Sequence, residues 1–417
     1  MSEQKQKRGL RCHICTGCGL CPGVGGNGTN REKPHVLDED ALLGKREPLP
    51  GKKRLAVADI GTTTIAMLLY RQDGSVEERF AGVNPQTEYG ADVLSRIRAA
   101  ENQNVAEKLK EQVEGVLEKG ISRFRKKLMP EEEMILVLAA NTTMTYLLLG
   151  RNSRELGQAP FHASFLQGVE TEISGVRVYV FPGMSAFVGG DILAGVCACK
   201  MDVSEEITLL VDLGTNGEMV LGNRQKRIAC ATAAGPAFEG GVNRGIWGAD
   251  MISLLARLRE EGRLDETGLL AEPYFETGIR IGNVLVTEEA IRSVQLAKAA
   301  IAAGIEILMT GYGITEEKID RVVLAGGFGY YLKPEAAAQI GLLPEKLAKK
   351  TFSGGNTVLS GTLMTGRKLL GGADWSDTER YLEQVAGETK VLNLAEQPAF
   401  KDRYICHMNL KSSVKDW

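Results

Sequence analysis

Two copies of one short pattern constrain the fold of this chain more than any other feature. Residues 55–58 are an apolar run that ends at Asp59, a Gly/Thr turn follows, and a second apolar run fills residues 65–70. The same order returns at residues 209–221, where an apolar run leads through Asp212 and a Gly-Thr turn into another. Short apolar runs joined by a tight turn predict buried β-hairpins. The repetition predicts two equivalent halves that face each other across a cleft.

These turns have a chemical use beyond reversing the chain. A glycine lets backbone N–H groups approach an anion closely, and threonine hydroxyls add further donors. An aspartate at the end of the strand can hold a water molecule on Mg²⁺. One such turn also occurs in ordinary hairpins, so the second copy is what favours a phosphate-binding role.

Length and composition exclude several classes of protein. The chain has 417 residues, enough for about two to three domains with their own cores. Its net charge is −3, which argues against a nucleic-acid partner. We find no apolar run long enough to span a membrane, and no signal-peptide core follows residues 1–8. We therefore expect a cytoplasmic protein, whose eight cysteines are metal ligands or buried thiols rather than disulfides.

Four of the cysteines lie close together near the start of the chain, at Cys12, Cys15, Cys18 and Cys21. This spacing, with glycines between, allows a short loop to wrap an iron–sulfur cluster, for which we expect the 4Fe–4S type. Structural zinc is the alternative, but zinc sites usually pair two C-x₂-C knuckles across a long gap. The last interval also departs from the bacterial ferredoxin pattern. The fourth ligand is therefore either Cys21 or a cysteine from elsewhere, including a second subunit.

The chain divides into four expected segments. Residues 1–30 are the cysteine-rich segment, and residues 31–52 are a linker that would serve either as a tether for a swinging redox module or as a plain disordered connection. One α/β lobe is expected over residues 53–200 and a second over residues 201–417. Within them we expect a strand at residues 134–139, a helix within residues 100–128, and a closing helix at residues 400–410 that buries Cys406.

Polar residues at two strand or helix ends are candidates for a site. The strand at residues 134–139 leads to Asn141, which fits a site at the end of a strand and a helix N-cap equally well. A helix of small residues at 192–199 follows Asp191, for which a helix N-cap is one role. Cys197 and Cys199 on this helix are expected to be small buried residues rather than ligands.

With these motifs in this order, the chain resembles the ASKHA superfamily, which comprises the acetate and sugar kinases, Hsp70 and the actin ATPases. Its third motif, a strand running into two glycines that pack against adenine, is matched at residues 322–329. The resemblance implies a two-lobed, duplicated, ribonuclease H-like α/β fold that binds ATP and Mg²⁺ between the turns. It also implies that Asp59 and Asp212 act through the water shell of the metal, and that Asp191 orients the attacking group. The nucleotide contacts that it implies are Gly61, Thr62, Thr63, Thr64, Gly214, Thr215, Asn216, Gly326 and Gly327, with Glu239 as a candidate ribose contact.

A narrower resemblance rests on four stretches, residues 59–64, 84–93, 212–218 and 235–241. Together they are similar to the iron–sulfur ASKHA proteins that reductively activate corrinoid enzymes. This resemblance implies a homodimer that uses ATP to pass an electron from a low-potential donor, through the cluster, to a Co(II)-corrinoid protein. Familiar members carry an N-terminal ferredoxin-like domain and a middle domain, or cluster motifs elsewhere. Here we expect a compact cysteine motif and a short linker to replace them.

Three functions compete on this evidence. The first is ATP-dependent reduction of a corrinoid protein. The second is ATP-dependent electron donation to another iron–sulfur enzyme, such as a radical dehydratase or a double-cubane cluster protein. The third is a small-molecule kinase with a structural metal knuckle, which leaves the four N-terminal cysteines idle and needs a substrate pocket that the sequence does not identify.

Overall fold

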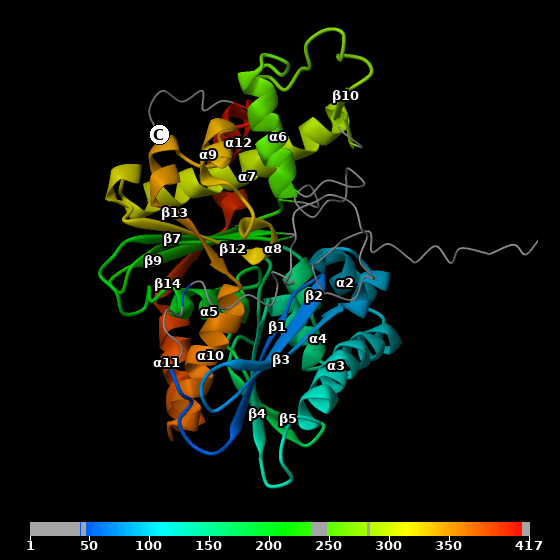
Figure 1. Ribbon diagram of the computed structural model, residues 1–417, viewed down its shortest axis with the longest axis vertical. Helices are drawn as coiled ribbons and strands as arrows, with labels where there is room; N and C mark the ends of the chain where they lie inside the picture. Colours follow the sequence, from blue (N-terminus) through cyan, green and yellow to red (C-terminus); the bar gives the residue numbers. More distant parts are fainter. Residues whose placement is uncertain (1–41, 43–46, 215, 235–247, 282–283, 411–417) are drawn as a thin grey trace, which may run out of the picture.

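The computed structural model describes residues 42, 47–214, 216–234, 248–281 and 284–410. In this part of the chain, two six-stranded mixed sheets form two lobes, with helices between and outside them (Figure 1). The expected two-lobed α/β fold is confirmed at this level. Cys12, Cys15, Cys18 and Cys21 lie outside the described residues, so the expected cysteine-rich segment stays a prediction.

The lower sheet has the strand order β3-β2-β1-β4-β6-β5. Its first three strands are an antiparallel meander, and β4 and β6 continue the sheet parallel to β1. The long helix α3 packs its stripe of Leu109, Val113 and Leu117 against one face, as its apolar spacing predicts. The elements are β1 (Arg54–Ile60), β2 (Thr64–Tyr70), β3 (Val76–Val83), α2 (Val93–Ala99), α3 (Gln103–Arg125), β4 (Met134–Ala140), α4 (Thr142–Leu148), β5 (Val169–Ile173) and β6 (Val176–Val180).

The upper sheet repeats this plan in the order β13-β12-β7-β8-β9-β14. A meander of β7, β8 and β9 is again extended by two strands parallel to its first member. Both Asp-x-Gly-Thr hairpins therefore occupy equivalent places, which confirms the expected duplication. The strands are β7 (Thr208–Leu213), β8 (Gly217–Gly222), β9 (Arg227–Thr232), β12 (Arg321–Ala325), β13 (Thr351–Gly355) and β14 (Thr389–Leu392), with a separate hairpin of β10 (Ile279–Ile281) and β11 (Val284–Val286).

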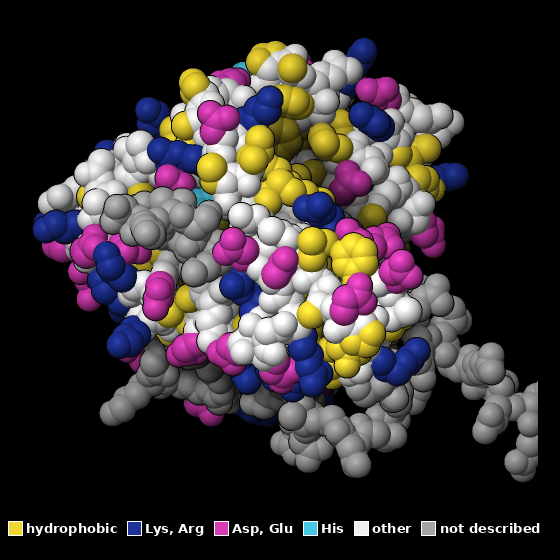
Figure 2. Space-filling view, turned by 90° about the horizontal axis from the view of Figure 1, so that it is seen from above, with side chains coloured by type: hydrophobic (Ala, Val, Ile, Leu, Met, Phe, Trp, Pro, Cys, Tyr) yellow, Lys and Arg dark blue, Asp and Glu magenta, His cyan; other side chains and the backbone are white. Residues whose placement is uncertain are grey.

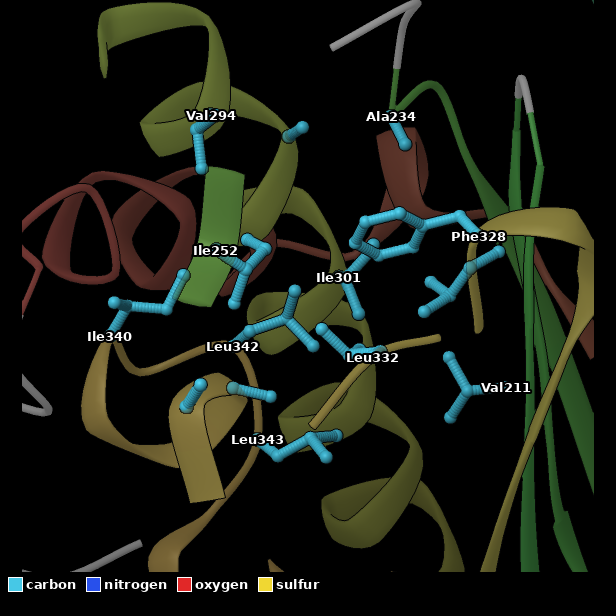
Figure 3. Close-up of a cluster of buried hydrophobic side chains, with 14 of the residues drawn as sticks. Val211, Ala234, Ile252, Val294, Ile301, Phe328, Leu332, Ile340, Leu342 and Leu343 are labelled. Carbon is cyan, nitrogen blue, oxygen red and sulfur yellow. The ribbon is translucent and has the colours of Figure 1, made fainter. Parts of the chain in front are cut away.

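Helices cover the outer face of the upper sheet. They are α6 (Gly248–Glu260), α7 (Glu288–Tyr312), α8 (Gly326–Gly329), α9 (Pro334–Gln339) and α12 (Phe400–Cys406). Their apolar side chains, including Ile252, Ile301 and Phe328, meet in one core (Figure 3). Among the described helices, α7 alone has the length and hydropathy of a membrane span, but 78% of that window is buried, so it is the central helix of this core. Charged side chains of both signs are interspersed on the outer surface above it (Figure 2).

Two helices of small residues lie between the sheets and join the lobes. They are α5 (Gly190–Ala198) and α10 (Thr357–Leu370), followed by α11 (Trp375–Gly387). They approach so closely that a Cβ atom at Gly361 would collide with the carbonyl oxygen of Ala194. One continuous core contains Val57 of the lower sheet and Leu210 of the upper sheet together with these helices. The helix of small residues expected at 192–199 is present as α5, whereas α11 was not among the elements predicted from the sequence.

The cysteines of the described residues give one confirmation and one correction. Cys197 and Cys199 are buried, as expected. Cys406 is exposed, so its expected burial is wrong. The closing helix is shorter than predicted, because α12 ends at Cys406, and no residue of this helix is fully buried. A short helix lying on the surface leaves its last residue on the solvent side.

Candidate nucleotide and metal site

Three aspartates from different elements meet between the lobes. Asp59 lies at the end of β1, Asp212 at the end of β7, and Asp191 in the first turn of α5. Burial raises the pKa of Asp59 to about 7 and that of Asp191 to about 6. Burial and the nearby charges of Asp191 and Asp59 raise the pKa of Asp212 to about 8. The structure thus brings together the three carboxylates that the sequence singled out, in a place where a cation would stabilise their ionised forms.

Asn356 fixes the orientation of the Asp59 carboxylate. Its Nδ2 donates a hydrogen bond of 2.8 Å to Asp59 Oδ2, while its Oδ1 accepts one from the N–H of Leu359. Asn356 is therefore the N-cap of α10 and a link from the lobe-joining helix to the site. The sequence analysis did not include Asn356 in the site. An asparagine placed before a helix of small residues signals a cap, but nothing local to it shows the contact with Asp59.

Glu218 is a fourth buried carboxylate, which the sequence analysis did not select. It is directly opposite Asp212 in the register of β7 and β8, and such partners carry their side chains on the same face of the sheet. Burial, and then the charges of Asp191 and Asp212, raise the pKa of Glu218 well above its ordinary value, and a hydrogen bond to Asn216 opposes this shift. The hairpin register would have been enough to place Glu218 beside Asp212.

The first turn is held in shape by a neighbouring segment of the same lobe. The carbonyl oxygen of Gly61 accepts a hydrogen bond from Asn84 Nδ2 at 3.0 Å, and that of Thr63 accepts one from the Asn84 N–H at 2.8 Å. The carbonyl oxygen of Thr62 accepts one from Arg96 at 2.5 Å, and Arg96 is fully buried. Because three successive carbonyl groups are bound in this way, the backbone of the turn is shaped before any ligand arrives.

Asn141 and Thr64 contribute polar groups at the first turn. Asn141 accepts from the N–H of Met144 and so caps α4, while its Nδ2 donates to Thr62 Oγ1 at 3.0 Å. The N-cap role of Asn141 is thus confirmed, and the same side chain also contacts the first turn, so its part in a site stays a prediction. The hydroxyl of Thr64 is buried and has no hydrogen-bond partner among the described residues. Buried polar atoms are normally satisfied, so a ligand is a natural partner for this hydroxyl.

Asp191 does not have the N-cap role that was its alternative. Gly189 occupies the N-cap of α5, and Asp191 lies in the first turn, where its Oδ1 accepts from the N–H of Ile192 at 2.8 Å. Its carboxylate therefore remains within the aspartate cluster. The catalytic role of Asp191 stays a prediction.

The second turn is in contact with the double-glycine motif after β12. Gly214 donates a backbone hydrogen bond to the carbonyl oxygen of Asn216 at 3.0 Å. Gly326 has a φ of +79°, and a Cβ atom there would lie 2.5 Å from Asp212 Oδ1. Only glycine suits this backbone and this contact. Gly327 follows and is exposed. Thr215 and Glu239, predicted with these residues, lie outside the described part of the chain.

The carboxylate cluster fits Mg²⁺ held through water and nucleotide. Within the described residues, no three acidic, histidine or cysteine side chains are placed to hold a metal ion by themselves. Mg²⁺ keeps several waters and is usually held by one or two carboxylates together with substrate phosphates. Asp59 and Asp212 offer hard oxygen ligands at the two turns, so they fit an ion brought in with a nucleotide better than a bare ion.

A cavity of about 440 Å³ adjoins the second turn. It lies between the lobes and is lined by Asn141 and Phe187 from the lower lobe and by Asn216, Glu218 and Tyr404 from the upper lobe. The sequence analysis identified no pocket, because the lining residues come from distant segments that carry no shared motif.

Two equivalent turns, a double-glycine motif and a buried aspartate cluster between two duplicated lobes define a protein of the ASKHA class. The chain belongs to the RACo family. A family model described as the C-terminal domain of RACo, the ASKHA domain, matches residues 206–244 and 241–416, and a model of the RACo middle region matches residues 55–204. The expectation that a short linker replaces the middle domain is therefore wrong. The middle region is the lower lobe itself, which the sequence analysis had counted as the first ASKHA lobe.

Individual proteins similar to this chain also support its membership of the RACo family. The chain is 30% identical to the corrinoid activation enzyme RamQ of Eubacterium limosum over 74% of this chain. It is 23% identical to the [Co(II) methylated amine-specific corrinoid protein] reductase of Methanosarcina barkeri over 63% of this chain. Among solved structures, a reductive activator for a corrinoid, iron–sulfur protein covers 86% of this chain with 31% identity and a TM-score of 0.74. The chain spans 63%, 56% and 66% of the lengths of these three proteins.

Proposed function

We propose that this protein is an ATP-dependent reductive activator of a corrinoid protein. It would couple ATP binding and hydrolysis to the transfer of an electron from a low-potential donor to a Co(II)-corrinoid acceptor. The observation that carries this proposal is the aspartate cluster between two phosphate-type turns, in a chain that matches RACo models over nearly all its described residues. The names of the similar proteins supply the corrinoid acceptor.

The residues of the cleft have distinct parts in this proposal. Asp59 and Asp212 would hold the water shell of a bound Mg²⁺ from the two turns, and Asp191 would orient the attacking water. The turns contact the phosphates, and Gly326 lets the backbone approach the nucleotide. Because these residues come from both lobes, Mg-ATP binds one arrangement of the lobes more tightly than others, and only such differential affinity can shift a conformational equilibrium.

The energies are compatible with this coupling. ATP hydrolysis supplies on the order of 10 kcal/mol in cells, and moving one electron uphill through about 0.3 V costs about 7 kcal/mol. The acceptor would dock at the mouth of the cleft, where the surface depends on the nucleotide. Cys12, Cys15, Cys18 and Cys21 would hold the iron–sulfur cluster that relays the electron, in a cytoplasmic homodimer.

The reaction can be tested in an anaerobic assay. It contains the full chain, a low-potential reductant, Mg-ATP and a corrinoid protein, and it follows the Co(I) absorption band. We expect Co(I) to form, and we expect a chain without the residues before Lys53 to bind nucleotide but transfer no electrons. If the corrinoid stays Co(II) while a radical dehydratase or double-cubane protein is reduced, electron donation to an iron–sulfur enzyme replaces this proposal.

The cluster has a separate test. Iron and sulfide analysis of the anaerobically purified protein, with its optical and EPR spectra, should show a reducible brown chromophore. Stoichiometric zinc without iron after reconstitution would contradict the cluster assignment. A chromophore bound to the N-terminal cysteines would also exclude the small-molecule kinase, whose metal knuckle is purely structural.

A further inference from the structure

Two pairs of aromatic rings, one pair from each lobe, line the cavity between the lobes. Phe161 and Phe187 belong to the lower lobe, and their ring centroids are 5.2 Å apart. Phe400 and Tyr404 belong to α12 of the upper lobe, with centroids 6.1 Å apart. All four rings are half-buried in the free protein, and the cavity of about 440 Å³ is large enough for a small organic ligand.

The charged lining of the cavity, within the described part of the chain, has one sign. Glu218 is the one charged side chain among the described residues that line it, and only 8% of Glu218 is exposed. No lysine or arginine is among those lining residues. A buried carboxylate with no basic residue among these lining residues is unfavourable for an anionic ligand and favourable for a cation. The phosphates of a nucleotide are therefore poor occupants of this space.

We propose that this cavity binds a small methylated ammonium cation. Aromatic faces attract such cations through the ring quadrupole, and methyl groups replace the hydrogen bonds that a primary ammonium would require. The rings of the two lobes would enclose the methyl groups, and Glu218, whose ionised form a bound cation would stabilise, would supply the countercharge. Asn141, Thr143 and Asn393, which also line the cavity, can hydrogen-bond a hydroxyl group elsewhere on the ligand.

The position of this site connects it to the aspartate cluster. Glu218 is opposite Asp212 in the hairpin register, and the enclosing rings come from both lobes. A bound cation would therefore favour the arrangement that brings the lobes together. Since coupling between sites is reciprocal, a ligand that favours the same arrangement as Mg-ATP would raise the affinity for Mg-ATP, and Mg-ATP would raise its affinity by the same factor.

Binding can be tested by calorimetry on the full chain with two probes of nearly the same shape. Choline carries the trimethylammonium group, and 3,3-dimethylbutan-1-ol is its uncharged isostere. We expect choline to bind at least tenfold more tightly than the isostere. Phe187→Leu and Phe400→Leu, which each remove one ring from a different lobe, should each weaken choline binding several-fold, and Glu218→Gln should weaken it most.

A matched control separates this effect from general damage. Phe352→Leu alters a ring that is 37% exposed on the edge strand β13, away from the lining residues, and should leave choline binding unchanged. Thermal unfolding shows that each variant is folded. Equal binding of the isostere, no saturable binding of choline to the folded protein, or choline affinity unchanged in all three cavity variants would each overturn the proposal.

Discussion

The two turns share a motif but differ in what surrounds them. In the first turn, which lies in the lower lobe, three carbonyl groups accept hydrogen bonds from Asn84 and Arg96, and the carboxylate of Asp59 accepts one from Asn356. In the second turn, which lies in the upper lobe, Asp212 is opposite a second buried carboxylate, Glu218. The protein itself shapes the first turn, whereas the second turn concentrates negative charge that protonation or a bound cation can relieve.

The strand partners explain this difference. Asp59 is paired with Ala66 across its hairpin, but Asp212 is paired with Glu218. Burial raises both pKa values, to about 7 for Asp59 and about 8 for Asp212. The two turns therefore differ in their hydrogen bonds and in their charge, and five predictions test whether they also differ in function.

The largest effect should come from the two aspartates themselves. Asp212→Ala and Asp59→Ala should each lower ATPase turnover more than tenfold, and Asp212→Ala by about a hundredfold, because electrostatic positioning dominates phosphoryl transfer. Steady-state phosphate release measures both. Wild-type rates in either variant would refute the assignment, and equal losses would remove the difference between the turns.

Asp191 belongs to neither turn and should affect rate rather than binding. Asp191→Asn keeps the size of the side chain and the acceptor for Ile192 but loses the charge that orients water. We expect hydrolysis to slow about tenfold or more, with nucleotide affinity nearly unchanged. Lost affinity with an intact rate, measured by calorimetry and phosphate release, would point to a different role.

The hydrogen bond from Arg96 to the first turn should contribute to both the free energy of unfolding and the nucleotide affinity. Arg96→Met leaves the buried carbonyl of Thr62 without its donor, which should lower the free energy of unfolding by about 1–3 kcal/mol. Arg98→Met, at an exposed position of the same helix, is the control. Denaturant unfolding and nucleotide titration should separate the two variants. Equal stability and equal nucleotide affinity of the two variants would mean that the hydrogen bond from Arg96 does not shape the turn.

A substitution at Gly326 tests the close approach of this residue to Asp212 at the second turn. Gly326→Ala adds backbone strain at a φ of +79° and places a methyl group against Asp212, so it should lose about 1–3 kcal/mol of stability as well as nucleotide affinity. Gly313→Ala has similar strain at +88° but no atom within 4 Å of the new Cβ. If both variants bind nucleotide equally, the contact with Asp212 is unimportant.

The smallest effect is a pH dependence of the nucleotide-free protein. Asp191, Asp59 and Asp212 have pKa values of about 6, 7 and 8, against about 3.9 in unfolded chains. The folded state therefore holds more protons over this window, and stability should fall as pH rises from about 4 to about 8. Asp212→Asn should flatten the slope, and so should Mg-ATP. Thermal unfolding at pH 6 and pH 8 measures it, and a rise in midpoint would contradict the pKa assignments.

The repeated elements could be predicted from the sequence. The contacts between residues that are far apart along the chain could not. Both hairpins and the aspartates were accessible because strand, turn and charge lie within a few residues. Asn356 was missed because its contact with Asp59 joins segments from opposite ends of the chain. The cavity was missed for the same reason, since Phe187 and Tyr404 line the same space only after the lobes are assembled.

One anaerobic measurement tests the central claim most directly. Co(I) formation and phosphate release are recorded together in a single sample of the full chain, corrinoid protein and reductant, with and without Mg-ATP, for the wild type and Asp212→Ala. The proposed function predicts that Co(I) appears only with Mg-ATP and that the variant loses both signals together. Equal Co(I) formation without nucleotide, or in a variant that no longer hydrolyses ATP, would contradict the coupling between the aspartate cluster and electron transfer.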